Sequence, residues 1–333
     1  MPVLIFIGKV RASLMNWWQA LVLGVIEGIT EYLPVSSTGH LIVAQKMMGI
    51  GVDADPFQAV KLTEAANCFA ICIQGGAILA VLGLYWPRVR QMIMGLLGKD
   101  PEGLKLIFLL LAGFLPAAVI GLALNDKIEK YLFHFQWVAL AWFTGGLAIL
   151  AVDRWMKKGG GSKGVGIAEM TLKMAVMIGF MQCLAMWPGT SRSLMTILGG
   201  LLIGLRLSAA VEFSFLLGLL TLGAATAKKA IWGVHLDEKW AKIPGYEAQT
   251  ALHDVAEKYS HKLGGAKLMW DTYGATPLLI GVIAATVSAA VAVKWMVGYL
   301  NRRGLGIFGW YRIAIGIAAA VMIATNFLNL NGH

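Results

Sequence analysis

The sequence predicts an all-α integral membrane protein, with six transmembrane helices and two re-entrant helical hairpins in an inverted-topology repeat. Three observations support this fold class. Hydrophobic residues make up 58% of the 333 residues and charged residues only 14%, whereas about 25% of the residues in a soluble domain are charged. Long unbroken apolar runs exclude the alternating strands of a membrane barrel. Two other apolar regions are interrupted by proline, glycine and hydroxyl-bearing residues.

Six apolar stretches are long enough to cross a bilayer, which takes about 20 helical residues. We expect these spans at residues 66–86, 105–124, 136–155, 209–231, 277–299 and 307–328. The chain is therefore expected to form a single membrane domain over residues 1–333.

The two interrupted regions do not fit a simple span. Residues 18–50 are broken at 33–39 (LPVSSTG), and residues 173–205 are broken at 187–193 (WPGTSRS). Each half is too short to cross a membrane. Because non-helical backbone at membrane depth is tolerated only inside protein or along a cavity, we interpret both regions as re-entrant hairpins.

The two interrupted regions also resemble each other. A shift of 155 positions places Gly24 on Gly179, Glu27 on Gln182, Tyr32 on Trp187, Ser36 on Ser191 and Thr38 on Ser193. Residues 18–156 and 173–328 then have the same order, a hairpin followed by three spans. Three spans change sides, so the second repeat is inverted. Paired broken segments of this kind point to a site near the bilayer midplane.

The net charge is +10, and the basic residues gather in the loops of one face. That face holds Arg88, Arg90, Lys99, Lys105, Arg154, Lys157, Lys158, Lys163, Lys173, Arg206, Arg302 and Arg303. The positive-inside rule predicts that it is cytoplasmic, so we attribute the charge to the membrane surface and not to nucleic acid. Residues 233–274 are then an extracytoplasmic insertion, with a helix expected at 246–262.

The first break carries titratable groups that are costly inside a membrane. Glu27 and Glu31 are four residues apart and share one helix face, and ionisable residues at this depth suggest function. Hydroxyls at 36–38 begin the next helix, whose free N–H groups and dipole favour an anion. His40 follows in the first turn and can act as acid, base or nucleophile.

The second break carries Arg192 between Ser191 and Ser193. Arginine matches phosphate through bidentate donors and a permanent charge, so two helix N-termini and one arginine predict a site for a multiply charged anion. Plainer interpretations stay open. The hydroxyls could be helix caps, Arg192 could extend to the membrane surface, and His40 could be a hydrogen-bonded histidine of the bundle.

The run at 27–40 (EGITEYLPVSSTGH), together with 188–193 (PGTSRS), closely resembles the undecaprenyl-diphosphate phosphatases, also known as bacitracin-resistance membrane phosphatases. The resemblance covers nearly the whole chain. It departs at the 233–274 insertion and at Leu194, where we expect a small residue. It implies hydrolysis of a C55-isoprenyl diphosphate lipid to the monophosphate, on the outer face of the bacterial inner membrane. This reaction recycles the lipid carrier of peptidoglycan synthesis.

The resemblance also implies functional roles for Glu27, Glu31, Ser37, His40 and Arg192. The candidates for substrate binding are Ser36, Thr38, Ser191, Ser193, Thr196 and Gln74. A divalent cation, Mg²⁺ or Ca²⁺, is expected on Glu27 and Glu31, because two carboxylates beside a phosphate repel each other unless a hard cation bridges them. The expected partners are the lipid substrate and membrane lipids, without nucleic acid, and a homodimer is left open.

Ser37 and His40 are three residues apart, so we predict that His40 takes the proton of the Ser37 hydroxyl. Direct attack by His40 and attack by a metal-activated water remain alternatives. The competing function is transport, since inverted repeats with broken helices also build transporters that could flip a lipid phosphate or move an ion. A lipid phosphatase with two histidines is disfavoured, because no histidine stands six residues after Arg192.

Overall fold

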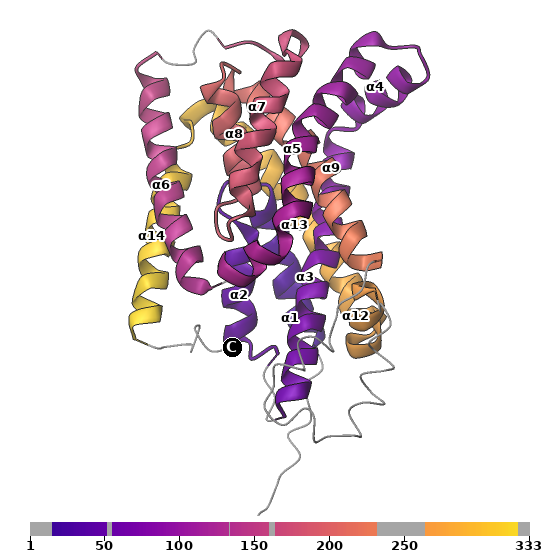
Figure 1. The fold of residues 1–333 in the computed structure, drawn as a ribbon, viewed down its shortest axis with the longest axis vertical. Coiled ribbons are helices and arrows are strands. Elements are labelled where there is room, and N and C mark those ends of the chain that lie inside the picture. The colour runs from indigo at the N-terminus through magenta and orange to yellow at the C-terminus, as the bar shows by residue number, and fades with distance from the viewer. Residues whose placement is uncertain (1–14, 52–54, 133, 160–163, 232–263, 326–333) are drawn as a thin grey trace, which may run out of the picture.

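The computed structural model describes residues 15–51, 55–132, 134–159, 164–231 and 264–325, and within these ranges it is helical without a β-strand (Figure 1). Six helices are long and apolar enough to cross a membrane: α3 (Pro56–Leu84), α5 (Pro101–Leu132), α6 (Phe135–Lys157), α9 (Leu207–Ile231), α13 (Ala275–Arg303) and α14 (Gly306–Ala324). They confirm the six predicted spans and a multi-pass membrane protein. Helix α3 begins ten residues early because Asp55 accepts a hydrogen bond from the Phe57 amide and Pro56 suits the first turn.

Two further helices were not predicted. Helix α4 (Trp86–Leu96) folds back on the start of α5, and α12 (Gly265–Tyr273) packs on α3 and α9. The Tyr273 hydroxyl of α12 donates a hydrogen bond to the Leu62 carbonyl of α3 at 2.9 Å. The last part of the 233–274 segment is therefore attached to the membrane helices. The helix expected at 246–262 lies outside the described residues.

Both interrupted regions are broken where the sequence predicts. Helix α1 (Trp17–Glu31) is separated from α2 (Ser37–Met47) by residues 32–36, which we call the first break. Helix α7 (Leu172–Cys183) continues into a short 3₁₀ turn, η2 (Leu184–Met186), and is separated from α8 (Arg192–Leu202) by residues 187–191, the second break. Each break ends on a serine with left-handed backbone, Ser36 at φ +73° and Ser191 at φ +76°. In the described chain these are the non-glycine residues with positive φ, a conformation that costs energy.

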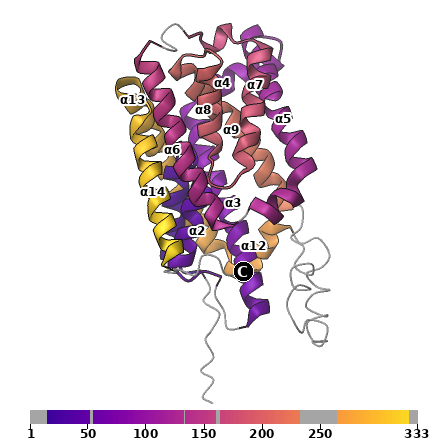
Figure 2. The same ribbon diagram turned by 60° about the vertical axis from the view of Figure 1, so that its left-hand side comes forward.

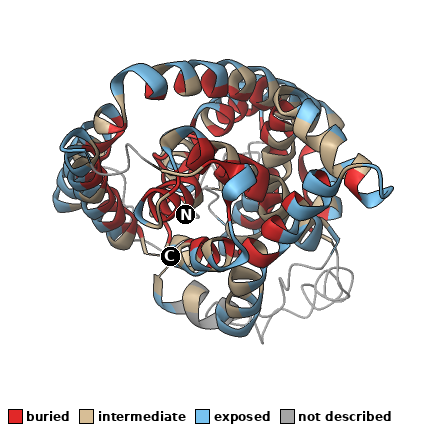
Figure 3. Cartoon of the chain, turned by 90° about the horizontal axis from the view of Figure 1, so that it is seen from above, coloured by how far each residue is buried: buried red, intermediate tan, exposed pale blue. Residues whose placement is uncertain are grey.

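Glycines allow the broken helices to lie close to their neighbours. A Cβ atom on Gly24 of α1 would lie 2.4 Å from the Gly281 carbonyl of α13, and one on Gly179 of α7 would lie 2.5 Å from the Gly113 carbonyl of α5. Small residues of this kind let membrane helices approach each other. Figures 1 and 2 show the breaks midway along the bundle, surrounded by the long helices. Seen along the bundle, buried residues concentrate in the central helices, and the outer helix faces are exposed (Figure 3).

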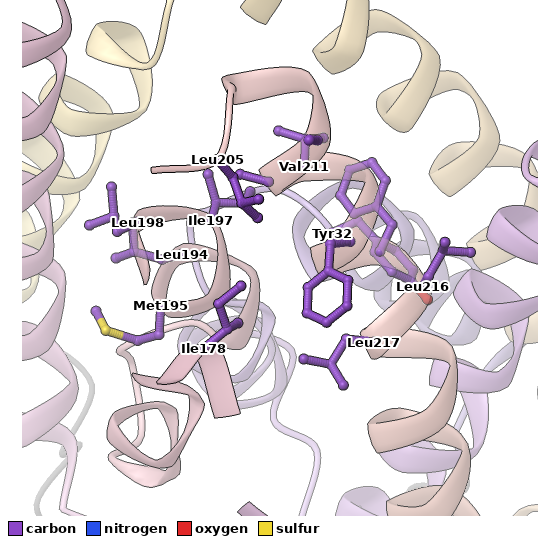
Figure 4. Packing of buried hydrophobic residues seen from close by; sticks show 14 of the residues in the cluster. Tyr32, Ile178, Leu194, Met195, Ile197, Leu198, Leu205, Val211, Leu216 and Leu217 are labelled. Carbon is purple, nitrogen blue, oxygen red and sulfur yellow. The ribbon is translucent and has the colours of Figure 1, made fainter. Parts of the chain in front are cut away.

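A hydrophobic core packs around the start of α8, directly after the second break. Leu194 is fully buried and belongs to the same cluster as Ile178 of α7 and Leu217 of α9 (Figure 4). The cluster has room for a leucine where a small residue was expected. The ring of Tyr32, from the first break, joins this cluster and packs edge-on against Phe215 at 5.3 Å between ring centroids. The two breaks therefore share one core.

The ends of the bundle differ in charge. The end that holds α4 and the junctions α6–α7, α8–α9 and α13–α14, at the top of Figure 1, is called the basic end. Its described residues include Arg88, Arg90, Lys99, Lys105, Arg154, Lys157, Lys158, Lys173, Arg206, Arg302 and Arg303. The loops that the sequence assigned to one face therefore gather at one end of the fold.

Candidate active site

Glu31, the last residue of α1, is the centre of a buried polar cluster. Its Oε2 atom accepts a hydrogen bond from the Ser37 hydroxyl at 2.5 Å and a longer one from Gln74 Nε2 at 3.5 Å. Its Oε1 atom lies 3.4 Å from Nη2 of Arg192. Four predicted site residues, from α1, α2, α3 and α8, are thus brought together. Glu31 and Arg192 are 161 positions apart, so only folding makes this contact.

Arg192, the first residue of α8, is held by contacts with α9 and with the first break. Its Nη1 atom donates to the Ser214 carbonyl of α9 at 2.9 Å, and its guanidinium carbon lies 5.2 Å from the centroid of the Tyr32 ring. A Cβ atom on Gly218 would lie 2.5 Å from Nη1, so α9 needs a glycine here. The Nε atom is buried and has no hydrogen-bond partner within the described residues. One donor and a loose 3.4 Å ion pair thus remain for an anionic ligand.

Glu27 is completely buried one helical turn before Glu31. Neither of its carboxylate oxygens has a hydrogen-bond partner in the described part of the chain. A buried, uncompensated carboxylate costs several kcal/mol or more, so this group needs a proton or a cation.

The donor set suits a hard cation that shares its ligands with a phosphate. No group of three or more His, Cys, Asp or Glu side chains that could hold a metal occurs among the described residues. Within the part of the chain that the structure describes, Glu27 and Glu31 could supply two carboxylate ligands, with the Ser37 hydroxyl and the Gln74 amide as further oxygen donors near Glu31. Mg²⁺ commonly binds proteins through one or two carboxylates together with substrate phosphates.

His40 lies in the first turn of α2, as predicted, but both of its ring nitrogens are engaged away from Ser37. Nδ1 is 2.6 Å from the Ser36 carbonyl, and Nε2 is 2.7 Å from the Tyr311 hydroxyl. The imidazole stacks on the Tyr311 ring, with 6° between the planes. The predicted hydrogen bond from Ser37 to His40 is thus replaced by one from Ser37 to Glu31. Ser37, the first residue of α2, points back across the first break toward Glu31. The His40 imidazole instead contacts the carbonyl of Ser36, the N-cap residue of α2.

The remaining hydroxyls mostly connect the two breaks. Ser193 Oγ donates to the Leu33 carbonyl at 2.9 Å and lies 3.0 Å from Ser191 Oγ. Thr196 Oγ1 lies 2.6 Å from Ser214 Oγ and so joins α8 to α9. Ser191, Ser193 and Thr196 therefore fix the frame of the site. Two other predicted residues differ in exposure, since Ser36 is buried and Thr38 is exposed.

A second arginine near the breaks, Arg312 of α14, was missed by the sequence analysis. Its side chain is fully buried and donates to carbonyls of both breaks, Pro34 at 3.2 Å and Gly189 at 2.9 Å, and to Ala141 of α6 at 2.7 Å. A Cβ atom on Gly145 would lie 2.4 Å from Nη2, so a glycine makes room for it. Its position as a lone arginine inside the apolar run 307–328 is the sequence signal that could have identified it.

The chain is similar to a known protein family and to several of its named members. The family model described as bacitracin resistance protein BacA matches residues 20–318. Among relatives, an undecaprenyl-diphosphatase from Ectopseudomonas mendocina is 36% identical over 319 residues, covering 95% of this chain and 97% of the relative. One from Sorangium cellulosum is 36% identical over 91% of this chain and 85% of its own. Undecaprenyl-diphosphatase 2 from Rhodospirillum rubrum is 38% identical over 94% of this chain and 96% of the relative. The chain belongs to the bacitracin resistance protein BacA family.

Proposed function

We propose that this chain hydrolyses undecaprenyl diphosphate to undecaprenyl phosphate and phosphate, and so recycles the lipid carrier of peptidoglycan synthesis. The observation that carries the proposal is the meeting of Glu31, Ser37 and Arg192 where the two breaks join. Phosphoryl transfer depends on positioning and on charge stabilisation, and this cluster combines a hydroxyl, a carboxylate and a phosphate-matching cation. The names of the family and of its relatives agree with this activity.

The proposed nucleophile is Ser37, with Glu31 as its base. The Ser37 hydroxyl donates to Glu31 Oε2 at 2.5 Å, so its proton passes to this carboxylate as Oγ bonds to the terminal phosphorus. The bond from that phosphorus to the bridging oxygen breaks, and undecaprenyl phosphate leaves. Water then attacks the phosphoserine, and the departing Oγ recovers its proton from Glu31. Arg192 stabilises negative charge on the phosphoryl oxygens throughout.

The candidate cation site supports the same chemistry. A divalent cation on Glu27 and Glu31, Mg²⁺ or Ca²⁺, would neutralise charge on the diphosphate oxygens. Exhaustive chelation should reduce phosphate release, and added Mg²⁺ should restore it. Mg²⁺ should also raise the melting temperature of the substrate-free protein, and Glu27→Gln should abolish that rise. Full activity after chelation, with no Mg²⁺-dependent stabilisation, would leave Glu27 as a protonated acid.

Packing between the two halves supports re-entrant hairpins in an inverted repeat. Helix α1 packs on α13 and α7 packs on α5, so each broken helix pairs with the second span of the other half. The first spans, α3 and α9, pair with each other, and so do the third spans, α6 and α14. Such exchanged pairing is expected when two halves are related by a two-fold axis in the membrane plane.

The proposed location is the bacterial inner membrane, with the basic end in the cytoplasm. The positive-inside rule supports this orientation, since the basic loops gather at one end of the bundle. The carboxylates lie on α1, which starts from the opposite end (Figure 1). We therefore propose that the substrate headgroup enters from the extracytoplasmic side.

Phosphate release by the purified protein in detergent tests the proposed function. A detergent micelle has no second compartment, so a flippase or ion carrier would release no phosphate from undecaprenyl diphosphate. The enzyme should release one phosphate per lipid, and Arg192→Gln should abolish the release. Failure of the folded wild-type protein to release phosphate, with and without Mg²⁺, would favour transport.

Trapping of a phosphoenzyme separates the candidate nucleophiles. An acid-stable phosphoenzyme that is absent from Ser37→Ala supports Ser37. An acid-labile, base-stable species would assign His40 instead. Turnover without either species, under rapid quenching, would assign an attacking water.

A further inference from the structure

A cavity lies at the basic end, well away from the breaks. It has a volume of about 490 Å³ and is formed where α6, α13 and α14 meet, with Arg154, Lys157, Arg303, Tyr299 and Trp310 in its lining. Arg154 is thirteen residues beyond Ala141, the residue of α6 that binds Arg312. At 1.5 Å per residue, the cavity lies about 20 Å along α6 from the level of the breaks. It is therefore separate from the candidate active site.

The cavity carries excess positive charge. Its one acidic residue, Asp153, is already engaged, since Oδ2 pairs with Lys157 at 2.7 Å and Oδ1 accepts the Leu305 amide at 2.9 Å. The side chains of Arg154 and Arg303 make no hydrogen bond or ion pair with any other described residue, and both residues are exposed. Two arginines from different helices thus face one cavity without a protein anion to pair with. Arginine is the side chain best suited to bind phosphate through paired donors.

Aromatic residues at the same level indicate that the occupant is a lipid. Trp310 is 62% exposed and lines the cavity, and Trp295 is 49% exposed on the adjacent face of α13. Trp295 stacks on Tyr299 with 5.3 Å between their ring centroids. Exposed tryptophan and tyrosine at the ends of spans mark the headgroup level of a bilayer. Basic pockets between spans on the cytoplasmic side are suited to anionic headgroups.

We propose that this cavity binds the phosphate-bearing headgroup of an anionic phospholipid, through Arg154 and Arg303, with acyl chains along α6 and α14. The headgroup would link the ends of three helices from both halves of the chain. Two of these helices, α6 and α14, also hold Arg312 and its Ala141 partner. Bound lipid therefore stabilises the helix pair that supports both breaks, without contact with the substrate.

Native mass spectrometry of the full-length protein tests this proposal. The protein is exchanged into detergent with equal amounts of phosphatidylglycerol and phosphatidylcholine, and the retained lipids are counted. Each basic side chain near an anionic lipid contributes about 1 kcal/mol, so Arg154→Gln/Arg303→Gln should retain at least about tenfold less phosphatidylglycerol than wild type. Arg154→Lys/Arg303→Lys, which keeps the charge, should lose less.

The matched control is Arg90→Gln/Lys99→Gln, which removes the same charge from exposed residues at the same end but outside the cavity. It should retain phosphatidylglycerol as wild type does. Equal retention in both variants, or equal loss in both, would overturn the proposal. Displacement of the lipid by millimolar inorganic phosphate would also overturn it in favour of a soluble phosphate. Phosphate release from undecaprenyl diphosphate in detergent, unchanged in all three variants, shows that they are folded.

Discussion

The first and second breaks share one backbone conformation but differ in how they cap the helix that follows. Each places a serine with left-handed backbone before an eleven-residue helix, Ser36 before α2 and Ser191 before α8. The Ser191 hydroxyl caps its helix by accepting the Leu194 amide, whereas Ser36 makes no side-chain cap. The second break therefore satisfies one backbone N–H group of its own helix start, and the first leaves the N–H groups at the start of α2 without a side-chain cap, where they can bind an anion.

The chemistry of the two breaks is also divided by charge. The helices that flank the first break carry the proposed site residues Glu27, Glu31 and Ser37, and the helix after the second break carries Arg192. Neither half holds a complete site, because Arg192 reaches Glu31 only across the interface between the halves. Two breaks with the same backbone geometry can thus carry different chemical groups when the side chains around them differ.

The largest difference between the breaks should appear when one hydroxyl is removed from each. Ser37→Ala should lower kcat by about 10³-fold or more, since loss of a nucleophile has effects of this size. Ser193→Ala should lower kcat by less than about tenfold. The Ser193 hydroxyl donates to the Leu33 carbonyl, so it joins α8 to the first break and takes no part in the chemical step. Phosphate release by the purified variants measures both. Substantial turnover by Ser37→Ala would end the serine assignment.

Arg192→Lys tests the charge that the second break contributes. The positive charge remains but the paired donors are lost, so kcat/KM should fall by about 10²- to 10³-fold, as for loss of one donor to a developing oxyanion. Arg206→Lys, an exposed arginine at the basic end, is the control and should behave as wild type. Turnover of Arg192→Lys close to that of wild type would remove Arg192 from the site.

Arg312 touches both breaks, so its replacement should affect them together. Arg312→Lys leaves at least one carbonyl of Pro34, Ala141 or Gly189 unpaired, at a cost of about 1–3 kcal/mol for each buried group. We expect a lower melting temperature in detergent and a smaller loss of kcat than for Arg192→Lys. Arg302→Lys, at an exposed helix end, is the control. An unchanged melting temperature would show that the carbonyls find other donors.

The smallest expected effect separates the two left-handed serines. Glycine adopts positive φ without strain, so Ser36→Gly, which loses no cap, should change the stability by less than about 0.5 kcal/mol. Ser191→Gly also loses the hydrogen bonds to Leu194 and Ser193, and it should destabilise by about 1 kcal/mol. Thermal unfolding of the two variants compares them directly. Equal stability would mean that the Ser191 cap contributes nothing.

Much of the fold was predictable because membrane spans are set by local composition. Six apolar runs of sufficient length gave the six spans, and Pro34 and Pro188 marked the two interruptions. Helix α4 was missed because its eleven residues are too few for a span and carry Arg88 and Arg90. Arg312 was missed because its neighbours in sequence are apolar, and only its carbonyl partners distinguish it from an arginine at a helix end.

The sequence by itself determined which chemical groups are present and how they are spaced along each helix. Glu27 and Glu31 one turn apart, hydroxyls at two helix starts and one arginine in the second break all follow from local geometry. The tertiary structure decided which groups meet. It joined Ser37 to Glu31 and turned His40 to Tyr311, and it brought Arg192 to Glu31. Helical spacing constrains neighbours within a few residues, whereas contacts across 161 or 278 positions depend on how the helices pack.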